Sequence, residues 1–167
     1  MNSKPVDILV VCTGNSCRSP MAEGILRDLL KKNGVKGVKV HSAGTMAPQG
    51  LAPAASAQLV AIEHGLDISG IRSRAVTREM VRDADIVFVM DKTHKRFLPG
   101  LEPLARRKVH LFKSFGKSPV EEEVADPMGG ELDLYRQCYE ELEREWIRIF
   151  PLLRGMFGKK QERSRKP

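Results

Sequence analysis

A cysteine and an arginine six positions apart, Cys12 and Arg18, are the residues of this chain best suited to covalent chemistry. A thiolate is a strong nucleophile, and a guanidinium presents a fork of donors that matches phosphate oxygens. The residues between them, Thr13-Gly14-Asn15-Ser16-Cys17, are small or short, so the backbone can turn several N–H groups inward around an anion. A nucleophile and an anion clamp that face one cradle indicate phosphoryl transfer through a cysteine.

The flanking segments predict that this cradle lies between a buried strand and a helix. An apolar run from Ile8, led in by Val6, ends at Cys12, and an amphipathic segment with Pro20 in its first turn follows Arg18. A helix N-terminus favours anions. On spacing alone, a buried strand-end Cys and a surface Arg would be the better interpretation. The strand–loop–helix context reverses that preference, and neither the dinucleotide-binding nor the P-loop NTPase motif is present.

The segment from Cys12 to Glu23, CTGNSCRSPMAE, resembles the signature of low-molecular-weight protein tyrosine phosphatases. Two later motifs agree with this resemblance: Ser42-Ala43-Gly44-Thr45 after a second strand, and Asp126-Pro127 towards the C-terminus. The resemblance covers about residues 5 to 155, which is nearly the whole chain. It implies a cysteine-dependent protein phosphatase that hydrolyses phosphotyrosine through a phosphocysteine intermediate.

The resemblance also implies a role for each site residue. Cys12 is the nucleophile, Arg18 holds the phosphate, and Asp126 acts first as general acid and then as base for the attacking water. Ser19 would donate a hydrogen bond to the cysteine sulfur, although a plain N-cap role for it stays open. Asn15 and Ser42 would hold the loop in shape. The residues expected to bind the substrate phosphate are Thr13, Gly14, Asn15, Ser16, Cys17 and Ser19. No metal or cofactor is implied.

Departures from the family pattern bear on the substrate. Most tyrosine-specific relatives carry a bulky aliphatic residue where this chain has Ser16, and a small Thr at that place resembles the bacterial protein arginine phosphatases. Met128 stands where an aromatic usually follows Asp-Pro. The Gly129-Gly130 pair also resembles the arginine-phosphatase branch. We expect phosphotyrosine as the substrate because tyrosine-specific members make up most of the family, with phosphoarginine as the close alternative.

Two further alternatives come from other classes of function. Arsenate reduction on this fold passes a disulfide to further cysteines after the third strand, but residues 90–108 contain no Cys. A non-catalytic phosphate-binding regulatory module would need a gap in the catalytic set, and none is seen. Cys17 could still form a reversible disulfide with an oxidised Cys12.

Strands that alternate with helices predict a single α/β domain over residues 5–157, with a four-stranded parallel sheet and helices on both faces. Ligands in such sheets lie at the carboxyl ends of the strands, where the phosphate-binding loop follows the first strand. The other expected strands are 38–41, 86–90 and 109–112. The expected helices are 20–32, 54–64, 78–82, 91–97 and 132–154, with Thr77 as an N-cap and residues 113–130 as a long loop.

The chain has 167 residues and a net charge of +7, but five positive charges and one negative charge lie in residues 159–167. We therefore expect residues 158–167 to be a basic disordered tail, and the body of the chain, at about +3, not to bind nucleic acid. A phosphorylated protein is the expected partner, and a monomer is expected.

No apolar run reaches the length of a membrane span, and the N-terminus has no secretory pattern, so we expect a cytoplasmic protein that does not bind a membrane. The three cysteines are expected to be free thiols. The four scattered histidines are expected at the surface or at strand ends, and Cys138 and Trp146 in the core.

Overall fold

The computed structural model describes residues 4–117 and 120–163, and it centres on a four-stranded sheet. The strands are β1 (Val6–Cys12), β2 (Val38–Gly44), β3 (Ile86–Val89) and β4 (Val109–Leu111). All pairs are parallel, and the order is β2-β1-β3-β4. Every residue of the central strand β1 is buried, as expected for a parallel strand covered on both faces. The predicted α/β architecture is confirmed.

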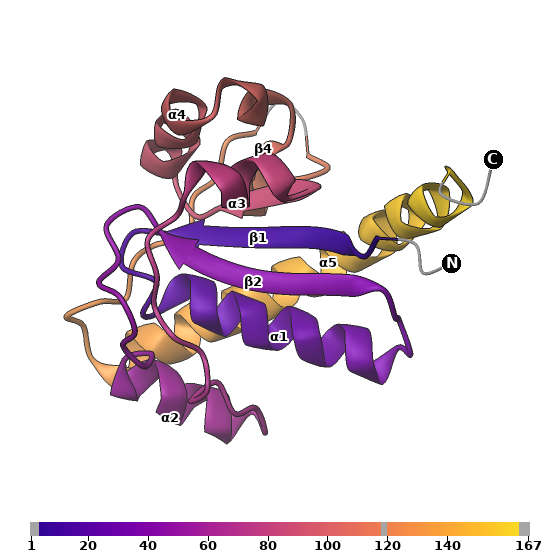
Figure 1. The fold of residues 1–167 in the computed structure, drawn as a ribbon. Coiled ribbons are helices and arrows are strands. Elements are labelled where there is room, and N and C mark those ends of the chain that lie inside the picture. Colours follow the sequence, from indigo (N-terminus) through magenta and orange to yellow (C-terminus); the bar gives the residue numbers. More distant parts are fainter. Residues whose placement is uncertain (1–3, 118–119, 164–167) are drawn as a thin grey trace.

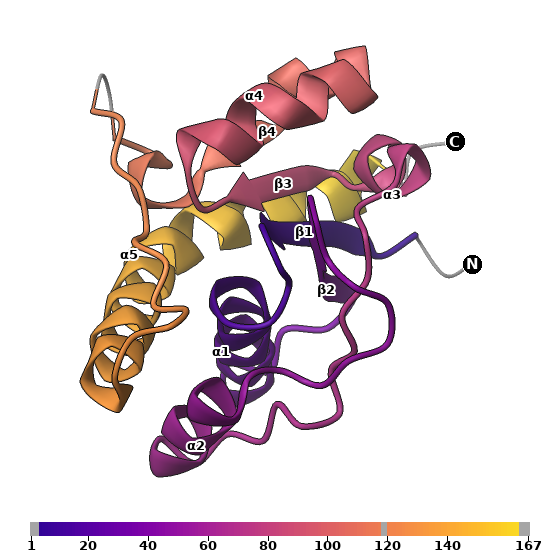
Figure 2. The same cartoon turned by 90° about the vertical axis from the view of Figure 1, so that its left-hand side faces the viewer.

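Helices cover both faces of this sheet, as Figures 1 and 2 show. On one face, α1 (Arg18–Lys32), α2 (Ala55–Glu63) and α5 (Leu132–Arg163) enclose the larger core cluster. On the other face, α3 (Arg78–Asp83) and α4 (Lys92–Leu101) cover a smaller aliphatic cluster. Short 3₁₀ turns occupy Pro103–Arg107 and Phe112–Ser114. Thr77 caps α3 as predicted, because its side chain accepts from the Met80 N–H.

Trp146 of α5 stands at the centre of the larger core and is fully buried. Its Nε1 donates to the carbonyl oxygen of Ala22 at 2.9 Å, which ties α5 to the first turns of α1. Its ring meets Phe88 and Phe112 edge-on, with centroids 5.1 and 4.6 Å away. Cys138 is also buried, so both residues lie in the core as predicted.

Two boundaries near the predicted phosphate-binding loop differ from the prediction. β2 extends to Gly44 instead of ending at His41, because Ser42, Ala43 and Gly44 continue the ladder with β1. Helix α1 begins at Arg18 rather than Pro20, and its N-cap position is Cys17. Ser19 therefore lies inside α1, and the alternative of an N-cap role for it was wrong.

The last helix is longer than predicted. α5 continues past Arg154 to Arg163 and includes Pro151, so residues 158–163 of the expected disordered tail are helical. The apolar stripe explains part of this extension, because Leu153 and Phe157, one helical turn apart, are both buried. Residues 164–167 of the tail, and 118–119 of the long loop, lie outside the described residues. In the part of the chain described, no helix is long and apolar enough to span a membrane.

Candidate active site

The predicted nucleophile and anion clamp lie at the two ends of the loop between β1 and α1. Cys12 is the last residue of β1 and is 3 % exposed, and Arg18 is the first residue of α1 and equally buried. Ser19, on the first turn of α1, brings its Oγ to 3.0 Å from the Cys12 Sγ. The hydroxyl can therefore donate to a thiolate at that position, which is the contact expected of Ser19. We call residues 12–18 the phosphate loop.

Asn15 gives the phosphate loop its shape. Its backbone is left-handed, with φ of 51°, and asparagine tolerates this region better than most side chains. The buried side chain donates to Ser19 Oγ at 2.8 Å and to Ser42 Oγ at 2.9 Å, and its Oδ1 accepts from the Arg74 N–H. Ser42 in turn donates to Glu23 Oε2 at 2.5 Å. The structure thus places the two residues expected to support the loop, Asn15 and Ser42, in direct contact.

The end of β2 approaches the phosphate loop closely. A Cβ added at Gly44 would lie 2.4 Å from the Thr13 carbonyl oxygen, which no side chain could tolerate without backbone movement. Just beyond, the Thr45 N–H donates to the Cys12 carbonyl and the Met46 N–H donates to the Thr13 carbonyl, both at 2.9 Å. The lack of space for a Cβ therefore explains why position 44 of the Ser-Ala-Gly-Thr motif is a glycine.

Arg18 holds together three segments that are far apart in the sequence. Its Nη1 donates to Asp91 Oδ2 at 3.2 Å and to the Val124 carbonyl at 3.0 Å. Its Nη2 lies 3.2 Å from Asp126 Oδ2 and 3.5 Å from Thr13 Oγ1. The expected general acid, whose side chain is 41 % exposed, is thus in an ion pair with the expected phosphate clamp. This contact brings the Asp-Pro motif to the phosphate loop.

Sequence reasoning missed two residues of the site, Asp91 and His94. Asp91 caps α4 by accepting from the His94 N–H at 3.1 Å. Burial alone would raise the pKa of Asp91, but the bond from that N–H, the His94 ring and Arg18 together hold it below its usual value. Asp91 directly follows Met90 at the carboxyl end of β3, a position that could have marked it as a candidate.

His94 corrects the expectation of surface or strand-end histidines. It is 1 % exposed, and its Nε2 lies 2.8 Å from Thr13 Oγ1 in the phosphate loop. Burial lowers the pKa of His94, which favours the neutral ring beside Arg18. His41 is also buried, where its Nε2 contacts Asp7.

Cys17 and Ser16, both expected to bind substrate, differ in exposure. The Cys17 thiol is buried in the core 3.7 Å from the Tyr135 hydroxyl, and burial raises its pKa, so only its backbone is available to a phosphate. Ser16 is partly exposed, and the one hydrogen-bond contact of its hydroxyl with the described part of the chain is to the Cys17 Sγ at 3.5 Å. The exposed Met128 lies over Gly14, since a Cβ there would sit 3.6 Å from the Met128 Cε.

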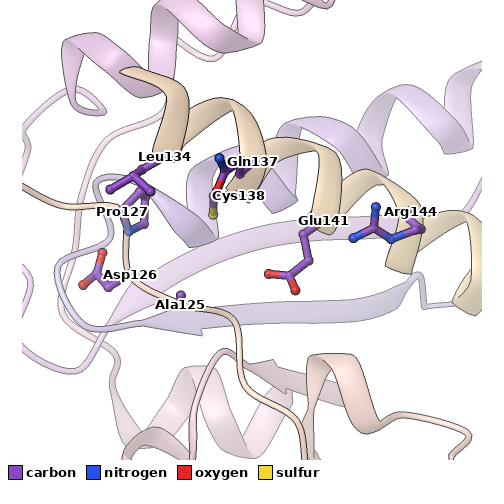
Figure 3. A pocket seen from close by; sticks show the side chains of 8 residues that line it. All are labelled: Ala125, Asp126, Pro127, Leu134, Gln137, Cys138, Glu141 and Arg144. Atoms are coloured by element: carbon purple, nitrogen blue, oxygen red, sulfur yellow. The ribbon is translucent and has the colours of Figure 1, made fainter. Parts of the chain in front are cut away.

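A cavity of about 390 Å³ lies between α5 and residues 125–127, the segment that carries Asp126. Figure 3 shows Asp126 at one end of it and Arg144 of α5 at the other, with Cys138 between them. Burial raises the pKa of the Cys138 thiol to about 12, so it stays protonated at neutral pH. Neither Cys12 nor Arg18 lines this cavity, so it neighbours the phosphate loop without containing it.

No group of three or more His, Cys, Asp or Glu among the described residues is arranged to hold a metal ion.

Comparison with known proteins agrees with this geometry. The family model for low molecular weight phosphotyrosine protein phosphatase matches residues 7–161. A protein-arginine-phosphatase of Bacillus subtilis is 35% identical over 139 residues, covering 83% of this chain and 90% of the relative. The low molecular weight protein-tyrosine-phosphatase Etp of Escherichia coli is 38% identical over 144 residues, covering 84% and 92%. Among solved structures, the YwlE arginine phosphatase from Geobacillus stearothermophilus superposes with a TM-score of 0.81 at 35% identity, covering 91% of this chain and 95% of that one.

Proposed function

Since the chain belongs to the low-molecular-weight phosphotyrosine protein phosphatase family, its function is that of a protein phosphatase, and we propose that Cys12 is its nucleophile. In the first step, the Cys12 thiolate attacks phosphorus, an S–P bond forms, and the bond from phosphorus to the substrate side chain breaks. In the second step, water attacks the phosphocysteine, and phosphate and the thiolate are released. The 3.0 Å contact with Ser19 supports this role, because a hydroxyl hydrogen bond stabilises the departing thiolate.

Arg18 and Asp126 complete the proposed chemistry. The Arg18 fork and the N–H groups of the phosphate loop hold the phosphoryl oxygens as charge shifts between them. Asp126 gives its proton to the leaving group in the first step and takes one from water in the second. The observation that carries the proposal is the convergence of Cys12, Arg18 and Asp126 from β1, α1 and the loop before α5.

Phosphotyrosine is the substrate we propose first, because the matching family model is one of phosphotyrosine phosphatases. Phosphoarginine is the second candidate, favoured by a specific observation. Ser16 is partly exposed in the phosphate loop, and among the described residues its hydroxyl has only the weak contact with Cys17, so it remains able to bond a guanidinium. Relatives named arginine phosphatases match this chain about as closely as those named tyrosine phosphatases.

Hydrolysis of phosphotyrosine and phosphoarginine peptides, measured side by side, tests both the mechanism and the substrate. We expect Cys12→Ser to lose turnover on either substrate by about 10³-fold or more, since the nucleophile is removed. The substrate is then decided by Ser16→Ile, which adds bulk, with Ser16→Ala as the matched control that only removes the hydroxyl.

The outcomes separate clearly. Phosphotyrosine hydrolysis that survives Ser16→Ile supports the first candidate, and strong phosphoarginine hydrolysis that collapses in Ser16→Ile supports the second. Wild-type protein with reduced Cys12 that acts on neither peptide would sink the catalytic proposal.

We also propose that the enzyme works in the cytoplasm, as a monomer, on phosphorylated proteins. All three cysteines are free and buried, and a catalytic thiolate needs a reducing compartment. Cys12, Arg18 and Asp126 all come from one chain, so the catalytic set does not require a second copy.

A further inference from the structure

A second cavity, of about 370 Å³, lies on the side of the molecule where α1 and β2 meet the segment between α2 and α3. Its lining includes three arginines, Arg27, Arg72 and Arg74, together with Glu23 and Ser42. We call it the arginine pocket. None of the three residues assigned to catalysis lines it.

The charges of the arginine pocket do not balance. Its one carboxylate, Glu23, is buried and already accepts from Arg27 at 2.5 Å and from Ser42. Within the described ranges, the side chain of Arg72 donates only to carbonyl oxygens of its own loop. The side chain of Arg74 donates to the Ser42 carbonyl and to the His41 ring. These acceptors satisfy donors but carry no full negative charge. Among the described residues the pocket lining therefore keeps an excess of two positive charges.

We propose that the arginine pocket binds a small oxyanion with at least two negative charges, of the phosphate or polyphosphate type. Guanidinium forks match the spacing of phosphate and carboxylate oxygens and bond them in pairs. The volume falls within the usual range for small-ligand sites, roughly 300–1,000 Å³. Arg27 and Arg74 are positioned by their bonds to the carbonyls of Val40 and Ser42, so two of the three forks are ordered before an anion arrives.

Two chains of hydrogen bonds connect the arginine pocket to the phosphate loop. Glu23 accepts from Ser42, and Ser42 accepts from Asn15. In addition, the Arg74 N–H donates to Asn15 Oδ1, while the Arg74 carbonyl accepts from the Gly44 N–H at 2.9 Å. An oxyanion that joins Arg72 to Arg74 thus fixes the segment that supports the left-handed Asn15. Binding in the pocket stabilises the folded form of the phosphate loop.

Calorimetric titration with pyrophosphate tests the site. The enzyme is first saturated with orthovanadate, which occupies the phosphate loop, and saturation is verified by loss of activity. We expect one further pyrophosphate to bind, and Arg72→Ala to weaken this binding by about tenfold or more, because a charge-assisted pair of bonds is lost. Arg72 is the residue to change because it is exposed and makes no contact with the Asn15 network.

Two matched variants sharpen the titration. Arg154→Ala removes an exposed arginine of α5 and should leave pyrophosphate affinity unchanged. Arg72→Lys keeps the charge but loses the planar fork, so its affinity should fall between wild type and Arg72→Ala. No binding to the vanadate-loaded enzyme, or equal binding by wild type and Arg72→Ala, overturns the proposal.

A further pair of measurements identifies the source of the oxyanion. If the ligand is a free small molecule, pyrophosphate added to the vanadate-loaded enzyme raises the Tm of wild type but not that of Arg72→Ala. If the substrate carries the oxyanion instead, Arg72→Ala has a higher KM than wild type for a doubly phosphorylated peptide. The two proteins then have the same KM for p-nitrophenyl phosphate. If neither difference is seen, the pocket has no such ligand.

Discussion

At the scale of single residues, Asn15 combines a left-handed backbone with side-chain hydrogen bonds that link the phosphate loop to α1, to β2 and to the segment before α3. Its φ of 51° costs free energy for any residue with a Cβ, and its side chain recovers that cost through bonds to Ser19, Ser42 and Arg74. The loop shape therefore depends on a side chain that does not itself react.

Two substitutions separate these contributions of Asn15. Asn15→Gly permits the left-handed backbone but loses the side-chain bonds, and we expect it to lower the free energy of unfolding by about 1–3 kcal/mol. Asn15→Ala loses the same bonds and also strains the backbone, which adds about 1 kcal/mol. Urea unfolding measures both, and kcat/KM should fall in the same order. Equal unfolding free energies for the two variants would show that the backbone conformation carries no cost.

The sequence predicted which residues lie together in the phosphate loop because the chain carries a local motif there. Cys12, Arg18, Asn15 and Ser19 lie within eight consecutive positions, so their types and order carry the information. Asp91 and His94 were missed because they reach the loop only through the folding of β3 and α4, more than 70 positions downstream. Asp126 was placed by resemblance alone, since nothing in its neighbourhood marks an Asp-Pro pair as catalytic.

At the scale of elements, the long loop after β4 is anchored at its inner end. The Val124 N–H donates to the Met90 carbonyl at 2.8 Å, and the Val124 carbonyl accepts from Arg18. Further out, the acidic run is tied to α4 by Lys95–Glu121 and by the Lys92 N–H to Glu123. Exposed ion pairs contribute little, so the buried backbone bonds of Val124 position Asp126.

The contact between α1 and α5 supports the helix that begins at Arg18, and Trp146 lies at the centre of this contact. We expect Trp146→Phe to lower the free energy of unfolding by about 1–3 kcal/mol, because the Ala22 carbonyl loses its donor and a void forms. In the described part of the chain, no hydrogen bond or ring contact joins Trp146 to the phosphate loop. At a temperature well below unfolding, kcat should therefore change less than twofold, roughly the limit for a remote stability effect. Ile147→Ala, an exposed neighbour on α5, is the control and should change neither quantity appreciably. A large loss of kcat with unchanged stability would contradict this division.

Element boundaries could be predicted only as far as local signals reach. The Thr77 cap was found because its hydroxyl acts within one turn. The end of β2 was placed too early because Ser42 and Gly44 have turn-like identities, while the ladder with β1 decides their conformation. The end of α5 was placed too early because the burial of Phe157 depends on tertiary packing.

At the scale of the whole molecule, the buried His94 and the partly buried His110 make stability depend on pH. Burial lowers the pKa of both His94 and His110 in the folded protein, whereas an unfolded histidine has a pKa of about 6.5. As the pH falls through 6.5, the unfolded chain takes up protons that the folded chain does not, so stability decreases. The lowered pKa values of Asp7 and Asp91 act in a separate window, below about 3.8, the ordinary value for Asp.

The urea midpoint at pH 5.5 should therefore be lower than at pH 7.5. His110→Phe provides the control, because His110 packs against Phe115 at 5.0 Å in a site remote from the phosphate loop. This variant should show a smaller decrease between the two pH values. A wild-type midpoint that is equal or higher at pH 5.5 would contradict the assignment.

The ion pair between Arg18 and Asp126 has a consequence for every anion that enters the phosphate loop. In the proposed mechanism, Asp126 competes within the molecule for Arg18, because it is tethered at a high effective concentration to the guanidinium that would hold the phosphoryl group. A phosphoryl dianion would displace the Asp126 carboxyl group from Arg18, and that group must then carry a proton to act as the proposed general acid. A monoanion of similar size interacts less strongly with Arg18, so it displaces Asp126 less readily. The Arg18–Asp126 ion pair would thus favour dianions over monoanions before any chemistry begins.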